Sequence, residues 1–179
     1  MNRISRHKQT SVIEQDIERV ARQEERLRFP GFDANTAWTV GTRIRELAAS
    51  RKLSVAIDIQ VNGHQLFFTA MPGTTPNNID WIRRKRNVVR HFHRSSYAIG
   101  LELRQQKTTL AEKIGVNDRD YAPHGGCFPI KLKGTGCIGT ITVSGLPQRA
   151  DHELIIEVLA ELLGQPLKEV ALEAQPDAK

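Results

Sequence analysis

The sequence predicts an α/β (α+β) fold in which helices pack on a central antiparallel sheet. Two hairpin patterns, in residues 53–71 and 121–143, alternate apolar and polar side chains as half-buried strands do. Helical patterns surround them, so the order is two helices, a hairpin, two helices, a hairpin and a helix. Two hairpins with helices between them favour one antiparallel sheet rather than a parallel one.

Composition is that of a globular protein of one domain, residues 1–179, with 39% apolar and 26% charged residues. Two cysteines give no disulfide framework. The first residues are basic and polar, unlike a secretory signal, and no apolar run approaches the roughly 20 residues that span a bilayer. We therefore expect a cytoplasmic protein that does not enter the membrane.

The net charge of +6 favours anionic partners, such as nucleic acid, phosphate or a ligand with carboxylates. A generic basic surface explains the same charge. Nucleic acid is the weakest of these candidates, because aromatic residues make up only 6% and no stacking platform is visible.

Two helices open the chain. Ser11 and Glu14 form a capping box that predicts a helix from residue 11 to residue 28, within an N-terminal helical extension of residues 1–30. Asp33 can cap a second helix over 34–52. Gly41 in the middle of that helix costs about 1 kcal/mol relative to Ala, which indicates close packing against a sheet or another helix.

The first hairpin turns at Asn62-Gly63, the strongest short signal for a type I′ turn. Residues 72–78 are rich in turn formers and read as a loop. A basic helix follows over 79–96, and another over 96–107. Residues 107–122 show no clear period, and we expect a loop with a short helical turn at 110–114.

The second hairpin is rich in glycine, and its register follows from its turn. A two-residue turn at 134–135, with Gly first as a type II′ turn prefers, sets Phe128 opposite Ile141 and Leu132 opposite Cys137. The apolar side chains of the two strands then lie on the same face of the hairpin.

That register separates the two cysteines, because Cys127 falls opposite Thr142. A disulfide between the cysteines is therefore not expected. Gly136 and Gly139 would leave the sheet face bare, so that a helix such as the one bearing Gly41 can pack close.

The last helix begins near Pro147 and ends at Gly164, with Asp151 in its first turn complementing the helix dipole. His152 falls on the inner side of that turn. Residues 166–179 read as a frayed tail.

Five blocks together resemble the haem-degrading domain family, the HbpS-like and GlcG-like group: "VAIDI", "GTTPNNIDWIRRKR", "HFHRSSY", "YAPHGGCFPI" and "GTGCIGTITVSGLPQRADH". The resemblance is closest to the branch carrying the W-I-x-R-K and H-G-G blocks and covers roughly residues 30–165. It implies a profilin-like antiparallel sheet of about five strands and a homo-oligomer. Some relatives bind or degrade haem, so haem is the candidate cofactor that the resemblance brings.

The "RRKR" run at 83–86 contains the first candidate ligand-binding residues. Four consecutive helical positions sweep about 300° around the axis, so they cannot all face solvent. Lys85 falls within the apolar stripe of this helix. It either extends past the core edge, pairs with Asp58 or a neighbouring subunit, or binds an anionic ligand. Arg84 also matches the family motif and is expected at a surface or a subunit interface.

The H-G-G block supplies the other candidates. Gly125 and Gly126 allow close backbone approach to a ligand and an anion-binding nest of N–H groups, or else provide a positive φ where the chain enters the sheet. His124 is the best candidate for a proton carrier or an axial iron ligand, against the alternative of a structural histidine.

No other motif selects chemistry. No Cys and His positions have the spacing of a zinc site, so no metal cluster is predicted, and nothing identifies catalytic residues. The leading hypothesis is an oligomeric protein that binds a small anionic ligand, a tetrapyrrole among the candidates, in a pocket bounded by residues 72–78, Lys85 and the H-G-G block. The alternative is a non-catalytic oligomeric scaffold for a protein partner.

Overall fold

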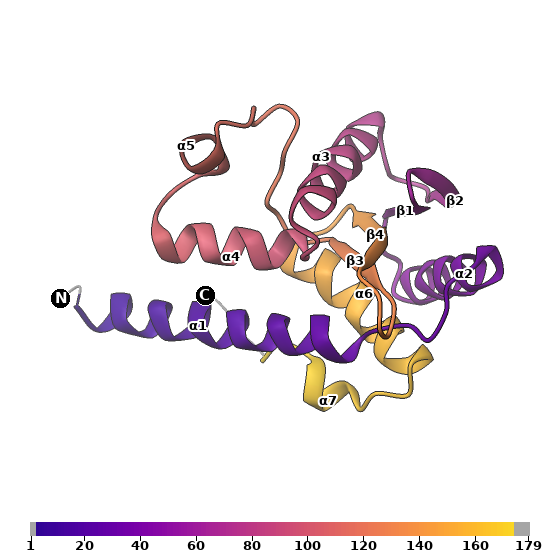
Figure 1. Ribbon diagram of the computed structural model, residues 1–179, viewed down its shortest axis with the longest axis horizontal. Coiled ribbons are helices and arrows are strands. Elements are labelled where there is room, and N and C mark those ends of the chain that lie inside the picture. Colours follow the sequence, from indigo (N-terminus) through magenta and orange to yellow (C-terminus); the bar gives the residue numbers. More distant parts are fainter. Residues whose placement is uncertain (1–2, 174–179) are drawn as a thin grey trace.

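The computed structural model describes the backbone of residues 3–173 and the side chains from residue 12 onward. The described chain contains seven helices and four strands (Figure 1). They are α1 (Arg3–Arg26), α2 (Ala34–Ser50), β1 (Ala56–Val61), β2 (His64–Ala70), α3 (Pro76–Phe92), α4 (Ser96–Gln106), α5 (Leu110–Ile114), β3 (Cys127–Lys131), β4 (Cys137–Ser144), α6 (Gln148–Leu162) and α7 (Leu167–Val170).

The four strands form one antiparallel sheet in the order β2-β1-β4-β3. The two hairpins meet through β1 and β4, which pair from Ala56 opposite Ser144 to Val61 opposite Gly139. The predicted fold class is confirmed, with four strands in the described sheet in place of the five or so that the family resemblance implied.

One face of the sheet carries the main apolar core. Odd-numbered residues of β1 and β4 point to this face, where α2 and α6 cover them. The fully buried side chains here include Ile57, Ile59, Phe128, Ile130, Ile141 and Val143.

The opposite face of the sheet is polar although it is buried. Asp58 of β1 lies opposite Thr142 of β4, and both face α3, which contacts β1, β3 and β4. Arg86 of α3 donates to Asp58 at 2.8 Å, and the Cys127 thiol lies 3.0 Å from the Thr142 hydroxyl. Burial of α3 therefore depends on matched polar groups.

The N-terminal helix is longer than predicted, because α1 begins at Arg3 and Ser11 lies inside it instead of capping it. It lies along α4 (Figure 1) and buries Val20 with Tyr97, Ala98 and Leu101. A capping-box pattern does not fix the start of a helix when the residues before it also favour helix, because the helix then continues through the pattern.

Polar contacts also join α1 to the C-terminal part of the chain. Gln23 donates to the Val170 carbonyl at 2.7 Å, and Arg149 pairs with Asp16. Of the segment 166–179, residues 174–179 lie outside the described residues. The described part includes α7 and the buried Val170 and Leu172.

The second hairpin confirms half of the predicted register. Phe128 lies opposite Ile141, but a bulge after Ile130 sets Lys131, and not Leu132, opposite Cys137. Gly134, with a φ of 75°, follows Lys133 within a turn closed by a bond from the Thr135 amide to the Leu132 carbonyl. The predicted two-residue turn starting at Gly134 is wrong, because the bulge absorbs one residue and moves the turn back along the chain.

The glycines of this hairpin do not receive a helix. A Cβ at Gly136 would meet nothing, and one at Gly139 would overlap the backbone of β1 at Gln60. Gly139 therefore allows close approach of strands, and the expected helix contact there is wrong. The predicted close packing of Gly41 is confirmed, since a Cβ there would overlap the Phe67 ring of β2.

Candidate functional site

A pocket of about 270 Å³ lies where the first half of α3, the segment before β3 and the start of α6 meet. Lys85 and His124, which are far apart in the sequence, both line it. The other lining residues are Asn77, Asn78, Trp81, Ser144, Gly145, Leu146, Gln148 and Asp151. We call this the Lys85 pocket.

Lys85 is buried, with 3% of its surface exposed. Its ammonium donates to the Asp151 carboxylate at 2.8 Å and to the Val143 carbonyl at 3.1 Å. The predicted partner Asp58 is wrong: Arg86, the next residue of α3, reaches Asp58, while Lys85 is turned toward the start of α6.

Asp151 has a second role besides meeting the helix dipole. Its other carboxylate oxygen accepts from the Leu146 amide at 2.9 Å, which holds the carboxylate at the turn before α6. Burial raises the pKa of Asp151, and the Lys85 charge opposes that rise. The pair places one positive and one negative charge at the pocket wall, so net positive charge must come from other residues.

His124 stands at the rim with its side chain partly in solvent. Its ring meets the Trp81 ring edge-on, with centroids 5.3 Å apart. Burial of part of the ring lowers the pKa of His124, and the charges of Lys85, Arg84 and Arg104 lower it further. The imidazole is therefore neutral at pH 7, with a nitrogen lone pair to offer.

A second pocket, of about 320 Å³, lies on the other side of His124. Arg84 and Arg104 line it together with apolar side chains that include Leu103 and Leu110. His124 is thus shared by two hollows, and two guanidinium groups lie beside it. We call this second hollow the Arg104 pocket.

Arg84 is half-buried and held in place. Its guanidinium lies 4.7 Å from the centre of the Trp81 ring and donates to the Asp118 carbonyl at 2.8 Å. Its Nε is buried without a hydrogen-bond partner among the described atoms. Trp81, Arg84 and Lys85 have the i, i+3, i+4 spacing that places them on one side of α3.

The two glycines of the H-G-G block line neither pocket. A Cβ at Gly125 would overlap the Gln148 carbonyl, and Gly126, with a φ of 112°, packs against the Val143 carbonyl and Lys85. The Gly125 amide donates to the Gln148 side chain at 3.3 Å. Close internal packing and positive φ account for both glycines, while their role toward a ligand stays a prediction.

Several residues of the site were not predicted, chiefly Trp81, Gln148 and Arg104. Trp81 carried a usable signal, because it shares a helix face with Arg84 and Lys85. Gln148 and Arg104 carried none, since only the packing of α4 and α6 brings them to His124. No three His, Cys, Asp or Glu side chains within the described residues are grouped to hold a metal ion.

The chain has one antiparallel sheet with helices on both faces and a polar pocket beside α3. These features make it a small α+β domain. The family model described as "Haem degrading protein HbpS-like" matches residues 32–160. The chain therefore belongs to the HbpS-like family.

Relatives and solved structures agree with this assignment. A UPF0303 protein of Azotobacter vinelandii is 60% identical over 161 residues, covering 90% of this chain and 97% of the relative. A UPF0303 protein of Serratia proteamaculans is 54% identical over 158 residues, covering 88% and 98%.

The crystal structure of the Ybr137w protein superimposes with a TM-score of 0.77 at 31% identity, covering 83% of this chain and 87% of that one. The PduOC:Heme complex superimposes with a TM-score of 0.60 at 13% identity, covering 73% and 94%, and supports the fold alone. In the part of the chain that the structure describes, no helix is both long and apolar enough to cross a bilayer.

Proposed function

We propose that this protein binds a small ligand with carboxylate groups, of the tetrapyrrole class, on the surface around His124. The observation that carries the proposal is the shared position of His124, whose neutral imidazole borders both the Lys85 pocket and the Arg104 pocket. The PduOC:Heme complex is an instance of a protein of this fold with haem bound, which is compatible with this ligand class.

The residues present fit such a ligand in two respects. The neutral His124 ring meets Trp81 edge-on and borders both hollows, so a ring nitrogen would be available to iron. Arg84 and Arg104 can pair with carboxylates, which guanidinium groups bind in bidentate fashion. Bound haem would supply the iron chemistry, while these side chains would bind and orient it.

Size limits how the ligand would lie. The hollows of about 270 and 320 Å³ are at the lower end of pockets for small molecules. Neither hollow alone would hold a whole tetrapyrrole, so such a ligand would be held by residues of both. Lys85, already paired with Asp151, would help to shape the wall more than supply charge.

Titration of the purified protein with haemin tests the proposal. We expect a saturable Soret shift, with affinity reduced at least tenfold in His124→Ala and several-fold in Arg84→Gln. His64→Ala is the matched control, since His64 is an exposed histidine of β2 that lines neither hollow. A response that does not saturate, or equal losses in His64→Ala and His124→Ala, would refute haem binding here.

The alternative scaffold function draws support from Trp38, which is 66% exposed on α2. Absence of saturable haemin binding in the unaltered protein would favour it. The homo-oligomer and the cytoplasmic location stay predictions under either function.

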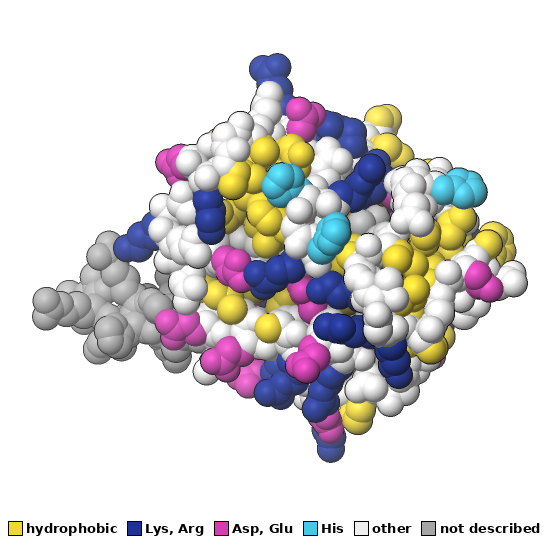
Figure 2. Space-filling model, viewed as in Figure 1, with side chains coloured by type: hydrophobic (Ala, Val, Ile, Leu, Met, Phe, Trp, Pro, Cys, Tyr) yellow, Lys and Arg dark blue, Asp and Glu magenta, His cyan; other side chains and the backbone are white. Residues whose placement is uncertain are grey.

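The distribution of charge on the surface bears on nucleic acid, the third class of partner. Figure 2 shows one face, where Lys and Arg side chains lie among Asp and Glu side chains. Nucleic-acid-binding surfaces concentrate basic residues in a patch or stripe.

A further inference from the structure

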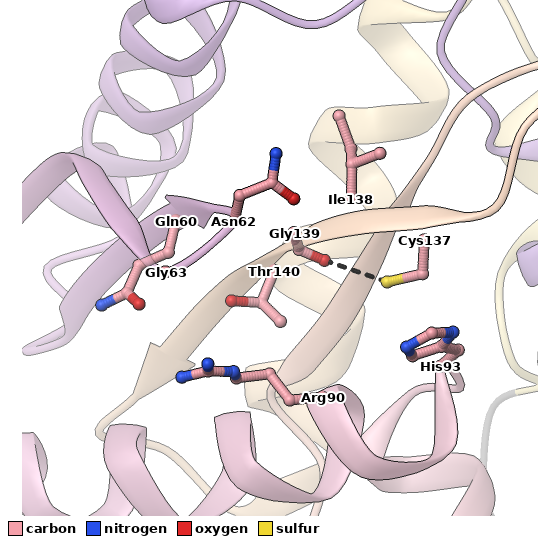
Figure 3. Close-up of a pocket in the computed structure, with 9 residues that line it drawn as sticks. All are labelled: Gln60, Asn62, Gly63, Arg90, His93, Cys137, Ile138, Gly139 and Thr140. Carbon is pink, nitrogen blue, oxygen red and sulfur yellow. Dashed lines mark hydrogen bonds between the residues drawn. The ribbon is translucent and has the colours of Figure 1, made fainter.

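A separate hollow of about 350 Å³ lies at the other end of α3, between its last turn and the ends of β1 and β4. Figure 3 shows its nine lining residues. Arg90 and His93 come from the end of α3, and the rest come from β1, the Asn62-Gly63 turn and β4. We call it the Arg90 pocket. It shares no lining residue with the Lys85 pocket or the Arg104 pocket.

The side chains in this hollow divide by direction. Gln60 and Thr140 lie opposite each other on neighbouring strands and point to the polar face of the sheet, toward Arg90 and His93 (Figure 3). Asn62 and Ile138 point to the other side of the strands. The space next to α3 is thus enclosed by a guanidinium, an imidazole, an amide and a hydroxyl.

Thr140 forms the floor and is 2% exposed. Its hydroxyl is closed off from solvent and has no hydrogen-bond partner among the described atoms. A buried hydroxyl without a partner has lost its hydrogen bonds to water without replacement, which destabilises the empty hollow. A group entering the hollow can supply the partner after a χ1 rotation, because staggered rotamers exchange the hydroxyl and methyl positions.

The charge of this hollow is positive. None of the nine lining residues is acidic, and Arg90 makes no ion pair with any residue of 12–173. Two buried carboxylates near the hollow are already paired, Asp58 with Arg86 and Glu24, whose charge acts on Cys137, with Lys131. The carboxyl end of α3 contributes a partial negative charge of about half a unit, which the Arg90 guanidinium exceeds.

Cys137 also lines the hollow but does not supply a nucleophile. Its thiol donates to the Gly139 carbonyl at 3.4 Å (Figure 3), and burial raises the pKa of Cys137. A protonated thiol is a poor nucleophile and a poor metal ligand. The hollow can therefore bind a ligand through N–H and O–H donors, but it does not supply a nucleophile.

We propose that the Arg90 pocket binds a phosphate monoester of a small molecule, independently of the ligand at His124. Arg90 can take two phosphate oxygens in bidentate fashion, and Thr140 and His93 can donate to the third. A carboxylate lacks the third oxygen to which Thr140 and His93 would donate. Gly63, with the φ of 82° that the hairpin turn requires, lies at the rim, where a Cβ would stand 3.9 Å from a nitrogen of the Arg90 guanidinium.

Calorimetric titration of the full-length protein at low salt tests this with two probes, phenyl phosphate and benzoate. We expect saturable binding of phenyl phosphate at least tenfold tighter than binding of benzoate. Arg90→Gln should weaken phenyl phosphate about tenfold, and Thr140→Val, which keeps the side-chain shape, should weaken it several-fold. His124→Ala should leave it unchanged, which separates this site from the one in the proposed function.

Arg45→Gln is the matched control, because Arg45 is an exposed arginine of α2 that lines none of these hollows. Equal weakening in Arg45→Gln and Arg90→Gln would mean nonspecific attraction to a basic protein and would overturn the proposal. Benzoate binding as tightly as phenyl phosphate, or no saturable binding of phenyl phosphate, would overturn it as well.

Discussion

At the scale of single residues, buried polar side chains determine which groups of this protein can change protonation. His152 is fully buried on the first turn of α6, and its Nε2 lies 2.7 Å from the Gln23 side-chain oxygen of α1. Its Nδ1 has no partner among the described atoms. Burial lowers the pKa of His152 to about 3, with the charges of Arg149 and Lys85 adding to the effect.

The lowered pKa of His152 predicts that the protein loses stability in mild acid. An unfolded histidine has a pKa of about 6.5, so between pH 6.5 and pH 3 the unfolded chain binds a proton that the folded chain does not. This contribution is fully present above pH 6.5 and falls as the pH falls. Between pH 7 and pH 5 the free energy of unfolding should drop by about 2 kcal/mol on this account.

Urea denaturation at pH 7 and pH 5 measures this drop. In His152→Gln the difference between the two pH values should be smaller by that amount, because Gln does not titrate. His64→Gln, at an exposed position of β2, should keep the difference seen in the unaltered protein. An identical difference in His152→Gln and the unaltered protein would contradict a neutral buried imidazole.

At the scale of elements, the distance between α2 and the sheet depends on a residue without a side chain. Gly41 of α2 lies under the Phe67 ring of β2, and that ring also meets Trp38 edge-on. Phe67 is 8% exposed, while its neighbour Phe68 is 42% exposed. The alternation of β2 therefore directs Phe67 into the core.

Gly41→Ala should destabilise the protein although Ala favours helices. Helix propensity would add about 1 kcal/mol, but the new Cβ overlaps ring atoms that have little freedom to move, and overpacking costs about 1–3 kcal/mol. We expect a net loss of about 1 kcal/mol in urea denaturation. The loss should disappear when the change is introduced into Phe67→Leu.

Gly136→Ala is the control for this change, because a Cβ at Gly136 meets nothing within 4 Å. Its stability should equal that of the unaltered protein. A Gly41→Ala variant more stable than the unaltered protein would show that α2 is free to move away from the sheet.

At the scale of the whole molecule, α1 closes a surface that the sheet and its helices leave open. It covers Tyr97, Ala98 and Leu101 of α4, each no more than 3% exposed. It also provides partners for buried groups, since Glu24 accepts from the Ser95 amide at 2.8 Å and from Lys131 at 3.0 Å. A helix with these contacts belongs to the core.

Deletion of residues 1–26 should therefore destabilise the rest of the protein. It would expose the apolar face of α4 and leave Lys131 and His152 without their α1 partners. We expect the Tm to fall by about 10 °C, the scale of a few kcal/mol for a chain of this size, with increased binding of the dye ANS.

Arg26→Gln is the matched control, because its ion pair with Glu169 lies at the exposed end of α1. It should leave the Tm unchanged. A truncated chain with an unchanged Tm and no dye binding would instead mean that residues 1–30 form a separable extension.

The sequence by itself determined the two hairpins and the longer helices, with their order, but not α7. Asn62-Gly63 specifies a hairpin, and the alternation of β1 and β4 specifies faces, because both signals act between residues close in the chain. The family followed from short blocks for the same reason. At the site, local spacing placed Lys85 within the apolar stripe of its helix, where the structure buries it.

Only the tertiary structure decided which partners these side chains have. Lys85 meets Asp151 and not Asp58, and His124 meets two separate hollows, because residues of α6 and α4 lie next to α3 through contacts that no local pattern encodes. The bulge after Ile130 likewise arises from pairing between strands. Local sequence sets which way a side chain points along its own element, whereas the charges and donors it meets depend on contacts between residues distant in the chain.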